Sequence, residues 1–133
     1  MEIRTIDNQP FIVLQKGKRE LVLPPTEVVA AARKRIADGQ AMLQSLASTR
    51  AVQQDRLEGA LLDGRSTAPA RKELATVIEL EADQAREIDS ATNEIAQVTA
   101  LIDQHRADEL ALEDQRKVAA LCKPLTDFLK DHQ

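Results

Sequence analysis

The chain has 133 residues, of which 30% are charged and 2% are aromatic. Compact enzymes fill their cores with aromatic side chains, so this composition favours long, thin helices over a globular catalytic domain. The formal net charge of -4 argues against a protein dedicated to nucleic-acid binding.

The first 24 residues are predicted to form a small N-terminal β-meander of three strands. Its strands are expected at residues 2–6, 11–14 and 21–23, and Gly17 supplies the positive φ that a tight hairpin turn needs. The second and third strands are apolar at consecutive positions, which puts apolar side chains on both faces of the sheet. One face can pack on the helices, and the other needs either more of this chain or a second subunit.

From residue 26 onward the sequence predicts a mainly α fold, a long antiparallel two-helix coiled-coil hairpin. The first helix is expected at residues 26–63, with Thr26 as its N-cap and Gly64 ending it in the left-handed conformation. The second helix is expected at residues 68–122. Pro124 then kinks or restarts the helix, and residues 125–131 form a short C-terminal helical turn. Residues 1–133 are predicted to form a single domain.

Apolar or small residues recur at alternating steps of three and four along both predicted helices, which is the spacing of a coiled-coil seam. The seam residues are Val29, Ala32, Ile36, Gly39, Leu43, Leu46, Leu57 and Ala60, followed by Leu74, Ile78, Ala85, Ile88, Ile95, Val98 and Ile102. A symmetric turn makes Arg50 face Glu81, a charged pair that fixes the register. Gly39, expected to face Thr92, predicts a close approach of the two helices.

The second predicted helix outruns the first, and its apolar stripe changes phase where the partner ends. Beyond about residue 106 a new stripe runs through Ala111, Val118, Leu121, Leu125 and Phe128. A different packing partner is expected there, either the N-terminal meander or a second chain.

The sequence holds no arrangement typical of a catalytic or metal site. His105, Asp108 and Glu109 share one helix face, but no Glu-x-x-His pair of the kind found in bundle-core metal sites occurs. We therefore predict no catalytic residue, no metal, no cofactor and no small-molecule substrate. Cys122, the only cysteine, lies on an apolar stripe and is predicted to be a buried structural thiol. A lone cysteine, no signal peptide and no apolar run of about 18 residues favour a cytoplasmic protein without a membrane span.

The leading hypothesis is a non-enzymatic protein–protein interaction or assembly module, a structural protein that forms homodimers. The apolar surface left over from the hairpin motivates this hypothesis. The partner or dimer interface is predicted at Phe11, Val13, Leu21, Leu23, Val118, Leu121, Leu125 and Phe128.

Two alternatives remain open at this stage. A small inhibitor or adaptor, for example a phage or mobile-element accessory, would dock an acidic helical face formed by Glu79, Asp83 and Glu87 on a macromolecular partner. A nucleic-acid-associated protein would use phosphate contacts from the basic residues Lys16, Lys18, Arg19, Arg33, Lys34 and Arg35. Because no aromatic side chain accompanies these basic residues, base stacking is missing and nucleic acid is the weaker alternative.

Overall fold

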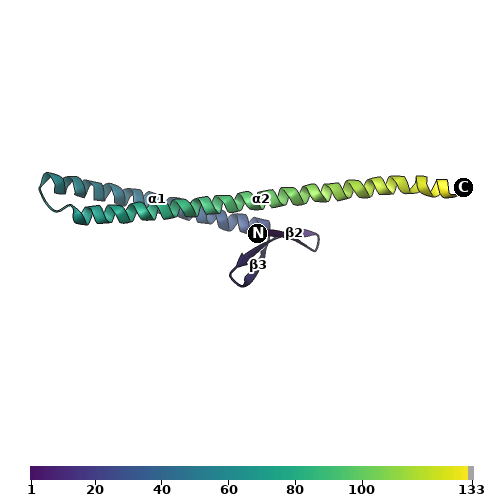
Figure 1. Cartoon of the computed structure of the whole chain (residues 1–133), viewed down its shortest axis with the longest axis horizontal. Helices are drawn as coiled ribbons and strands as arrows, with labels where there is room; N and C mark the ends of the chain where they lie inside the picture. Colours follow the sequence, from purple (N-terminus) through teal and green to yellow (C-terminus); the bar gives the residue numbers. More distant parts are fainter. Residues whose placement is uncertain (132–133) are drawn as a thin grey trace. The chain divides into compact units, whose positions relative to one another are not determined.

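The computed structural model describes residues 1–131, with side chains as far as residue 123. In chain order it contains the strands β1 (Glu2–Ile6), β2 (Gln9–Lys16) and β3 (Arg19–Leu23) and the helices α1 (Pro25–Leu62) and α2 (Ala68–Asp131) (Figure 1). The helices take up 38 and 64 residues, which confirms a mainly helical fold that begins with a small antiparallel sheet. Within the described residues, no helix combines the length and the apolar character needed to cross a membrane.

The chain divides into two compact units. The sheet unit consists of Met1–Pro25 with Gln97–Gln133, and the hairpin unit is Thr26–Ala96. Helix α2 therefore gives its first part to the hairpin unit and the remainder to the sheet unit. Each unit has its own set of packed residues and is described separately below.

In the sheet unit, β2 lies between β1 and β3 and pairs antiparallel with both. Gly17 has a φ of 63° in the turn between β2 and β3, as the sequence predicted. Strand β2 begins earlier than predicted and takes in Pro10. The last residue pair between β2 and β3 is Ile12 with Leu23, so Pro10 lies beyond it and its missing N–H removes no bond to β3.

Both faces of the sheet are covered at its centre. The adjacent β2 residues Ile12 and Val13 point to opposite faces and are only 0% and 2% exposed. On the Ile12 face, the Thr5 hydroxyl Oγ1 lies 3.1 Å from His105 Nε2 of α2. The two-faced apolar pattern of β2 is therefore satisfied within one chain at the middle of the sheet.

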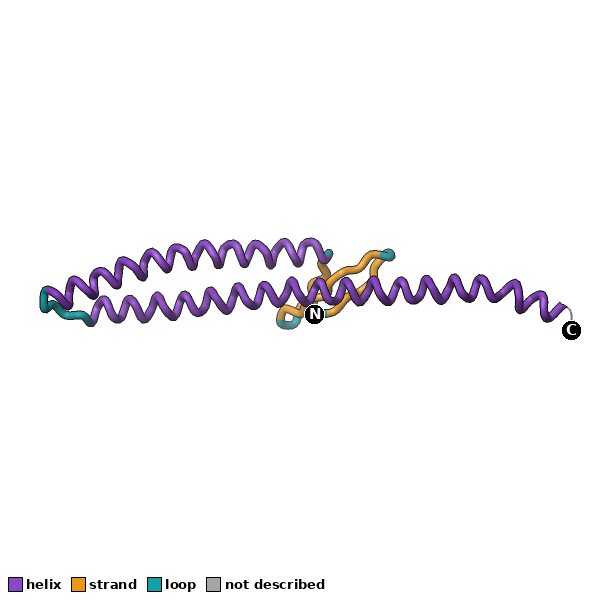
Figure 2. Tube along the Cα trace, turned by 90° about the horizontal axis from the view of Figure 1, so that it is seen from above, coloured by secondary structure: helices purple, strands orange, loops and turns teal. Residues whose placement is uncertain are grey.

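In the hairpin unit, α1 ends at the predicted glycine. Gly64 has a φ of 68°, and the Arg65 amide donates to the Ala60 carbonyl at 2.9 Å, a pairing that closes a helix after a left-handed residue. Ser66 Oγ accepts a hydrogen bond from the Ala68 amide at 3.4 Å and so caps the start of α2. Figure 2 shows α1 and the first part of α2 running side by side from this turn.

Buried residues of the hairpin unit recur every seven positions on each helix. They are Ala32, Gly39, Leu46, Gln53 and Ala60 on α1 and Ala70, Val77 and Ala91 on α2, with the half-buried Gln84 between the last two. Val28, near the start of α1, is also buried but lies off this spacing. A half-buried set flanks them at the same spacing: Val29, Ile36, Leu43, Arg50 and Leu57 on α1 and Leu74, Glu81, Ile88 and Ile95 on α2. Ile78 and Ala85, which the sequence placed in the seam, are exposed. Val77 fits the sevenfold spacing set by Ala70, and the adjacent Ile78 does not.

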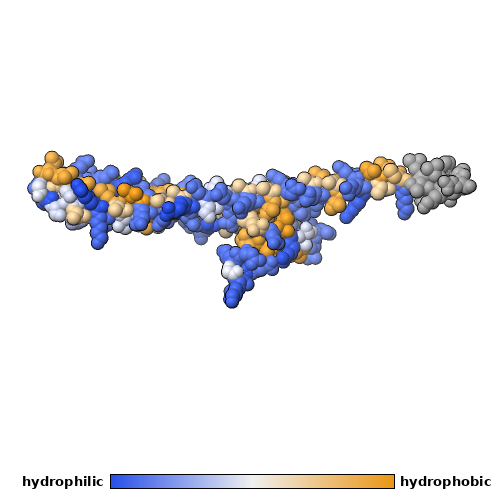
Figure 3. Space-filling model, in the orientation of Figure 1, coloured by the Kyte–Doolittle hydropathy of each residue, from blue (hydrophilic) through white to orange (hydrophobic). Residues whose placement is uncertain are grey.

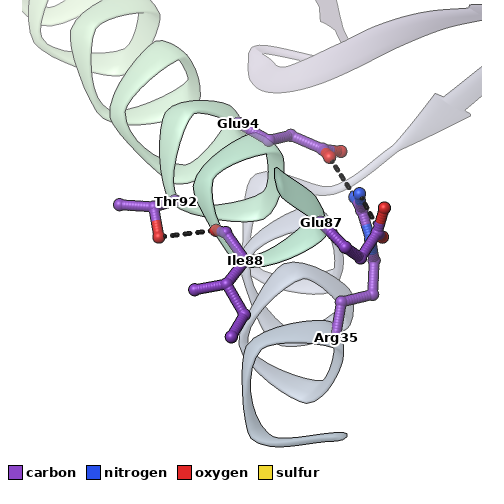
Figure 4. Close-up of polar contacts among 5 residues, drawn as sticks. All are labelled: Arg35, Glu87, Ile88, Thr92 and Glu94. Carbon is purple, nitrogen blue, oxygen red and sulfur yellow. Dashed lines mark hydrogen bonds and ion pairs between the residues drawn. The ribbon is translucent and has the colours of Figure 1, made fainter. Parts of the chain in front are cut away.

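Two sets of ion pairs join the helices of the hairpin unit. Arg35 donates through Nε to Glu87 Oε1 at 2.7 Å and through Nη1 to Glu94 Oε2 at 2.6 Å (Figure 4). The hydrogen bond to Glu87 raises the pKa of Arg35 more than partial burial lowers it, so the guanidinium stays charged. Arg50 Nη1 lies 3.3 Å from Glu81 Oε2, which confirms the facing pair predicted from the register. The other carboxylate oxygen, Glu81 Oε1, is buried without a hydrogen-bond partner among the described residues.

The two helices approach closely at Gly39, as predicted, but the side chain that faces Gly39 is Ile88 and not Thr92. A Cβ added at Gly39 would lie 2.8 Å from Ile88 Cγ1, so no side chain larger than hydrogen fits without movement. Thr92, the predicted neighbour, is exposed and its hydroxyl donates to the Ile88 carbonyl at 2.8 Å (Figure 4). The glycine therefore makes room for a branched side chain of α2.

The C-terminal end of α2 differs from the prediction. The helix continues through Pro124 to Asp131, where the sequence predicted an end at Cys122 and a separate helical turn. A proline inside a helix removes one backbone hydrogen bond and commonly bends the axis, but it does not always end the helix. Lys123 and Leu125, its neighbours, are both good helix formers.

Candidate functional site

Residues 106–123 of α2 are all exposed, and we call this segment the overhang. The last covered residue before it is His105, whose side chain is 14% exposed beside Thr5 of β1. The overhang includes Leu110, Val118 and Leu121, with exposed fractions of 60%, 59% and 75%. Figure 3 shows apolar surface along this part of α2. No other part of the described chain packs on this stretch of helix.

The overhang has a continuous face with coiled-coil spacing. Ala107, Ala111, Asp114, Val118 and Leu121 follow one another at alternating steps of four and three, so they lie on one side of the helix. Ala111, Val118 and Leu121 were predicted from the sequence, but Ala107 and Asp114 were missed. The same spacing includes Asp114 between Ala111 and Val118, and one step back from Ala111 it includes Ala107. The face therefore contains one carboxylate.

Charges in the middle of the overhang are segregated along the chain. Glu113 and Asp114 are acidic, Gln115 is neutral, and Arg116 and Lys117 are basic. Lys117 Nζ lies 3.3 Å from Glu113 Oε1, an exposed pair of the kind that stabilises a helix only slightly. The side chains of Asp114 and Arg116 make no hydrogen bond or ion pair with other described residues.

Cys122 is exposed, and the prediction of a buried thiol is wrong. The sequence argument was that the cysteine lies on an apolar stripe. It does lie near the stripe of the overhang, but nothing in the described chain covers that stripe. The sequence shows which residues share a face and leaves open what packs on it.

The residues predicted as a partner interface in the sheet are placed differently from one another. Val13 is buried, and on its face an ion pair at 2.9 Å between Arg4 and Glu20 joins β1 to β3. Phe11 and Leu23 are half-buried and Leu21 is exposed. The helical residues of the predicted interface are Val118, Leu121, Leu125 and Phe128. Val118 and Leu121 are exposed, and the side chains of Leu125 and Phe128 lie outside the described residues. Exposed apolar surface is therefore larger on the overhang than on the sheet.

The acidic face predicted on α2 is partly engaged in ion pairs. Glu87 is held by Arg35, and Asp83 pairs with Arg86 one turn away on the same helix. Glu79 makes no ion pair with the other described residues. The three carboxylates therefore do not act as one unpaired acidic surface.

The predicted basic residues fall in two places. Lys16, Lys18 and Arg19 lie at the turn between β2 and β3, in the sheet unit. Arg33, Lys34 and Arg35 lie on α1, in the hairpin unit, and Arg35 is already bound by two carboxylates. The basic residues therefore form two separate groups, one at the turn of the sheet and one on α1.

The candidate metal ligands near the overhang do not converge. Asp108 Oδ1 accepts a hydrogen bond from Gln104 Nε2 at 2.9 Å. His105 Nε2 lies 3.6 Å from Glu109 Oε1 and 3.1 Å from the Thr5 hydroxyl. Among the residues that the structure describes, no group of three or more His, Cys, Asp or Glu is arranged to hold a metal ion.

A cavity of about 780 Å³ opens between the helices near their turn, in the hairpin unit. The residues that line it are Gln53, Arg56, Ala60, Arg65, Ser66, Pro69, Ala70 and Glu73. Gln53 is 8% exposed, and its amide makes no hydrogen bond with the other described residues. The cavity lies where Gln53 interrupts the apolar seam, three residues after Arg50, and the sequence predicted a break in the apolar pattern at both positions.

Comparison with known proteins gives no match: no family model, no curated protein and no solved structure is significantly similar to this chain.

Proposed function

We propose that this protein is a non-enzymatic assembly module that works as a homodimer joined through the overhang. The observation that carries the proposal is the complete exposure of residues 106–123, an α-helical segment with an apolar stripe. Helices in water owe most of their stability to the packing of an apolar face, and an isolated helix of this length is marginal. A helix that keeps this face exposed is therefore explained by a partner that covers it.

The hairpin unit fits the same proposal as a stiff spacer. We propose that α1 and the first part of α2 form an antiparallel coiled coil, which the sevenfold spacing of buried and half-buried residues supports. The ion pairs of Arg35 and Arg50 add register-specific contacts between the two helices.

Hydrodynamic mass tests the proposal directly. Sedimentation equilibrium of the full chain should show a dimer at micromolar concentration. Leu121→Asp places a charge on the proposed interface and should weaken the dimer roughly tenfold or more, since a buried leucine contributes about 1.5–3 kcal/mol.

The matched control is Leu62→Asp, which makes the same change at the end of α1, where Leu62 is 88% exposed. This variant should keep the wild-type mass. A wild-type chain that remains monomeric throughout the micromolar range would refute the proposed function.

A further inference from the structure

We infer that the two overhangs pair antiparallel, about a two-fold axis that crosses α2 near Gln115. The inference rests on the proposed dimer and names its partner and direction: a second copy of this chain, running the opposite way. A two-fold axis makes the interface self-complementary, so each contact occurs twice.

The order of charges favours the antiparallel direction. Glu113 and Asp114 precede Gln115, and Arg116 and Lys117 follow it. Of these four residues, Asp114 lies on the stripe and Lys117 flanks it, whereas Glu113 and Arg116 point away from it. Two antiparallel copies bring Asp114 of one beside Lys117 of the other, on both sides of the axis. Two parallel copies in register bring Asp114 beside Asp114, which is repulsive.

The position of Asp114 gives a second reason. Asp114 occupies a core position of the stripe, between Ala111 and Val118. In a parallel pair its carboxylate would meet the same carboxylate of the other copy in a partly dry interface, where two like charges are strongly unfavourable. In an antiparallel pair Asp114 lies beside Val118 and within reach of the Lys117 ammonium of the other copy.

Gln115, which flanks the stripe next to the axis, suits this geometry. It would lie beside Gln115 of the second copy. An amide carries both donors and an acceptor, so two glutamines related by a two-fold axis can hydrogen-bond to each other. A charged residue at this place would meet its own charge.

The single cysteine distinguishes the two directions. In the antiparallel pair Cys122 lies opposite Asp108 of the other copy, and the two Cys122 residues are about 21 Å apart along the helix axis. In the parallel pair in register Cys122 lies at the same height as Cys122 of the other copy and about 21 Å along the axis from its Asp108. A disulfide requires Cα atoms within about 7 Å, so a bond between positions 108 and 122 forms only in the antiparallel arrangement.

Oxidation of the full chain therefore tests the direction. Asp108→Cys, with Cys122 retained, should give disulfide-linked dimers whose cross-linked peptides join position 108 to position 122. The wild-type chain, which has Cys122 alone, should remain uncross-linked under the same conditions. The control is Glu109→Cys, one residue further on and facing away from the stripe, which should cross-link poorly.

The possible results separate the direction from the dimer itself. A wild-type dimer by sedimentation that oxidises efficiently through Cys122 to Cys122 would overturn the antiparallel direction and leave the proposed function intact. A chain that is monomeric by sedimentation would overturn both.

Reversal of the charges supplies an independent measurement. Asp114→Lys places a like charge beside Lys117 of the other copy and should weaken dimerisation by more than tenfold. Adding Lys117→Glu exchanges the two charges and should restore most of the wild-type affinity. Failure of the double variant to recover would contradict the charge pairing on which the direction depends.

Discussion

Gly39→Ala is the substitution whose sign depends most directly on how closely the two helices approach. In an ordinary helix interior, alanine is more favourable than glycine by about 1 kcal/mol. Here the added Cβ would lie 2.8 Å from Ile88 Cγ1 and 3.2 Å from Ile88 Cδ1, so the isoleucine or the helix must move. Overpacking of this kind costs about 1–3 kcal/mol. The two effects leave a net destabilisation of about 0–2 kcal/mol.

A double-mutant cycle separates the two effects. Ile88→Ala removes both atoms that the new Cβ would meet, at a cost near the lower end of about 2–5 kcal/mol because Ile88 is half-buried. Gly39→Ala in that background should become stabilising by about 1 kcal/mol, since only the helix propensity remains. Urea unfolding followed by circular dichroism at a fixed protein concentration gives all four free energies. A stabilising Gly39→Ala in the wild-type background would refute the close approach.

Two further predictions concern polar side chains of the hairpin unit. Gln53→Leu should change the free energy of unfolding by less than about 1 kcal/mol in urea titrations, because the amide lines the open cavity, where water can hydrogen-bond to it and an apolar side chain gains little; a loss of more than about 2 kcal/mol would contradict this placement of the amide. Arg35→Ala should cost about 1 kcal/mol, and less in high salt, because it removes two ion pairs between the helices. The control Arg86→Ala removes only a pair within one helix and should change stability by a few tenths of that amount.

The helices and their turn could be predicted from the sequence because local chemistry decides them. Gly64 is the residue that a helix end with positive φ requires, and Arg50 and Glu81 follow from the symmetry of the turn. The choice between Val77 and Ile78 for the seam could not be made locally, since both are apolar and only packing distinguishes them.

Burial was harder to predict than secondary structure. Val13 and Cys122 both belong to apolar patterns, yet Val13 is covered within the chain and Cys122 is exposed. A pattern shows that a side chain prefers an apolar neighbour, and tertiary contacts decide whether one is present.

The state of the overhang should depend on protein concentration. Its first residues continue a helix already formed up to His105, so nucleation is complete and only propagation is at stake. In the monomer the overhang has no packing to hold it, and its amides should exchange with solvent quickly. In the proposed dimer the stripe would be covered, and exchange should slow. Hydrogen exchange measured by mass spectrometry should therefore show protection of residues 106–123 that rises with concentration, while the hairpin unit stays unchanged.

The Leu121→Asp variant should show the unprotected pattern at every concentration. Equal protection in the variant and the wild type would mean that the overhang is stabilised within its own chain.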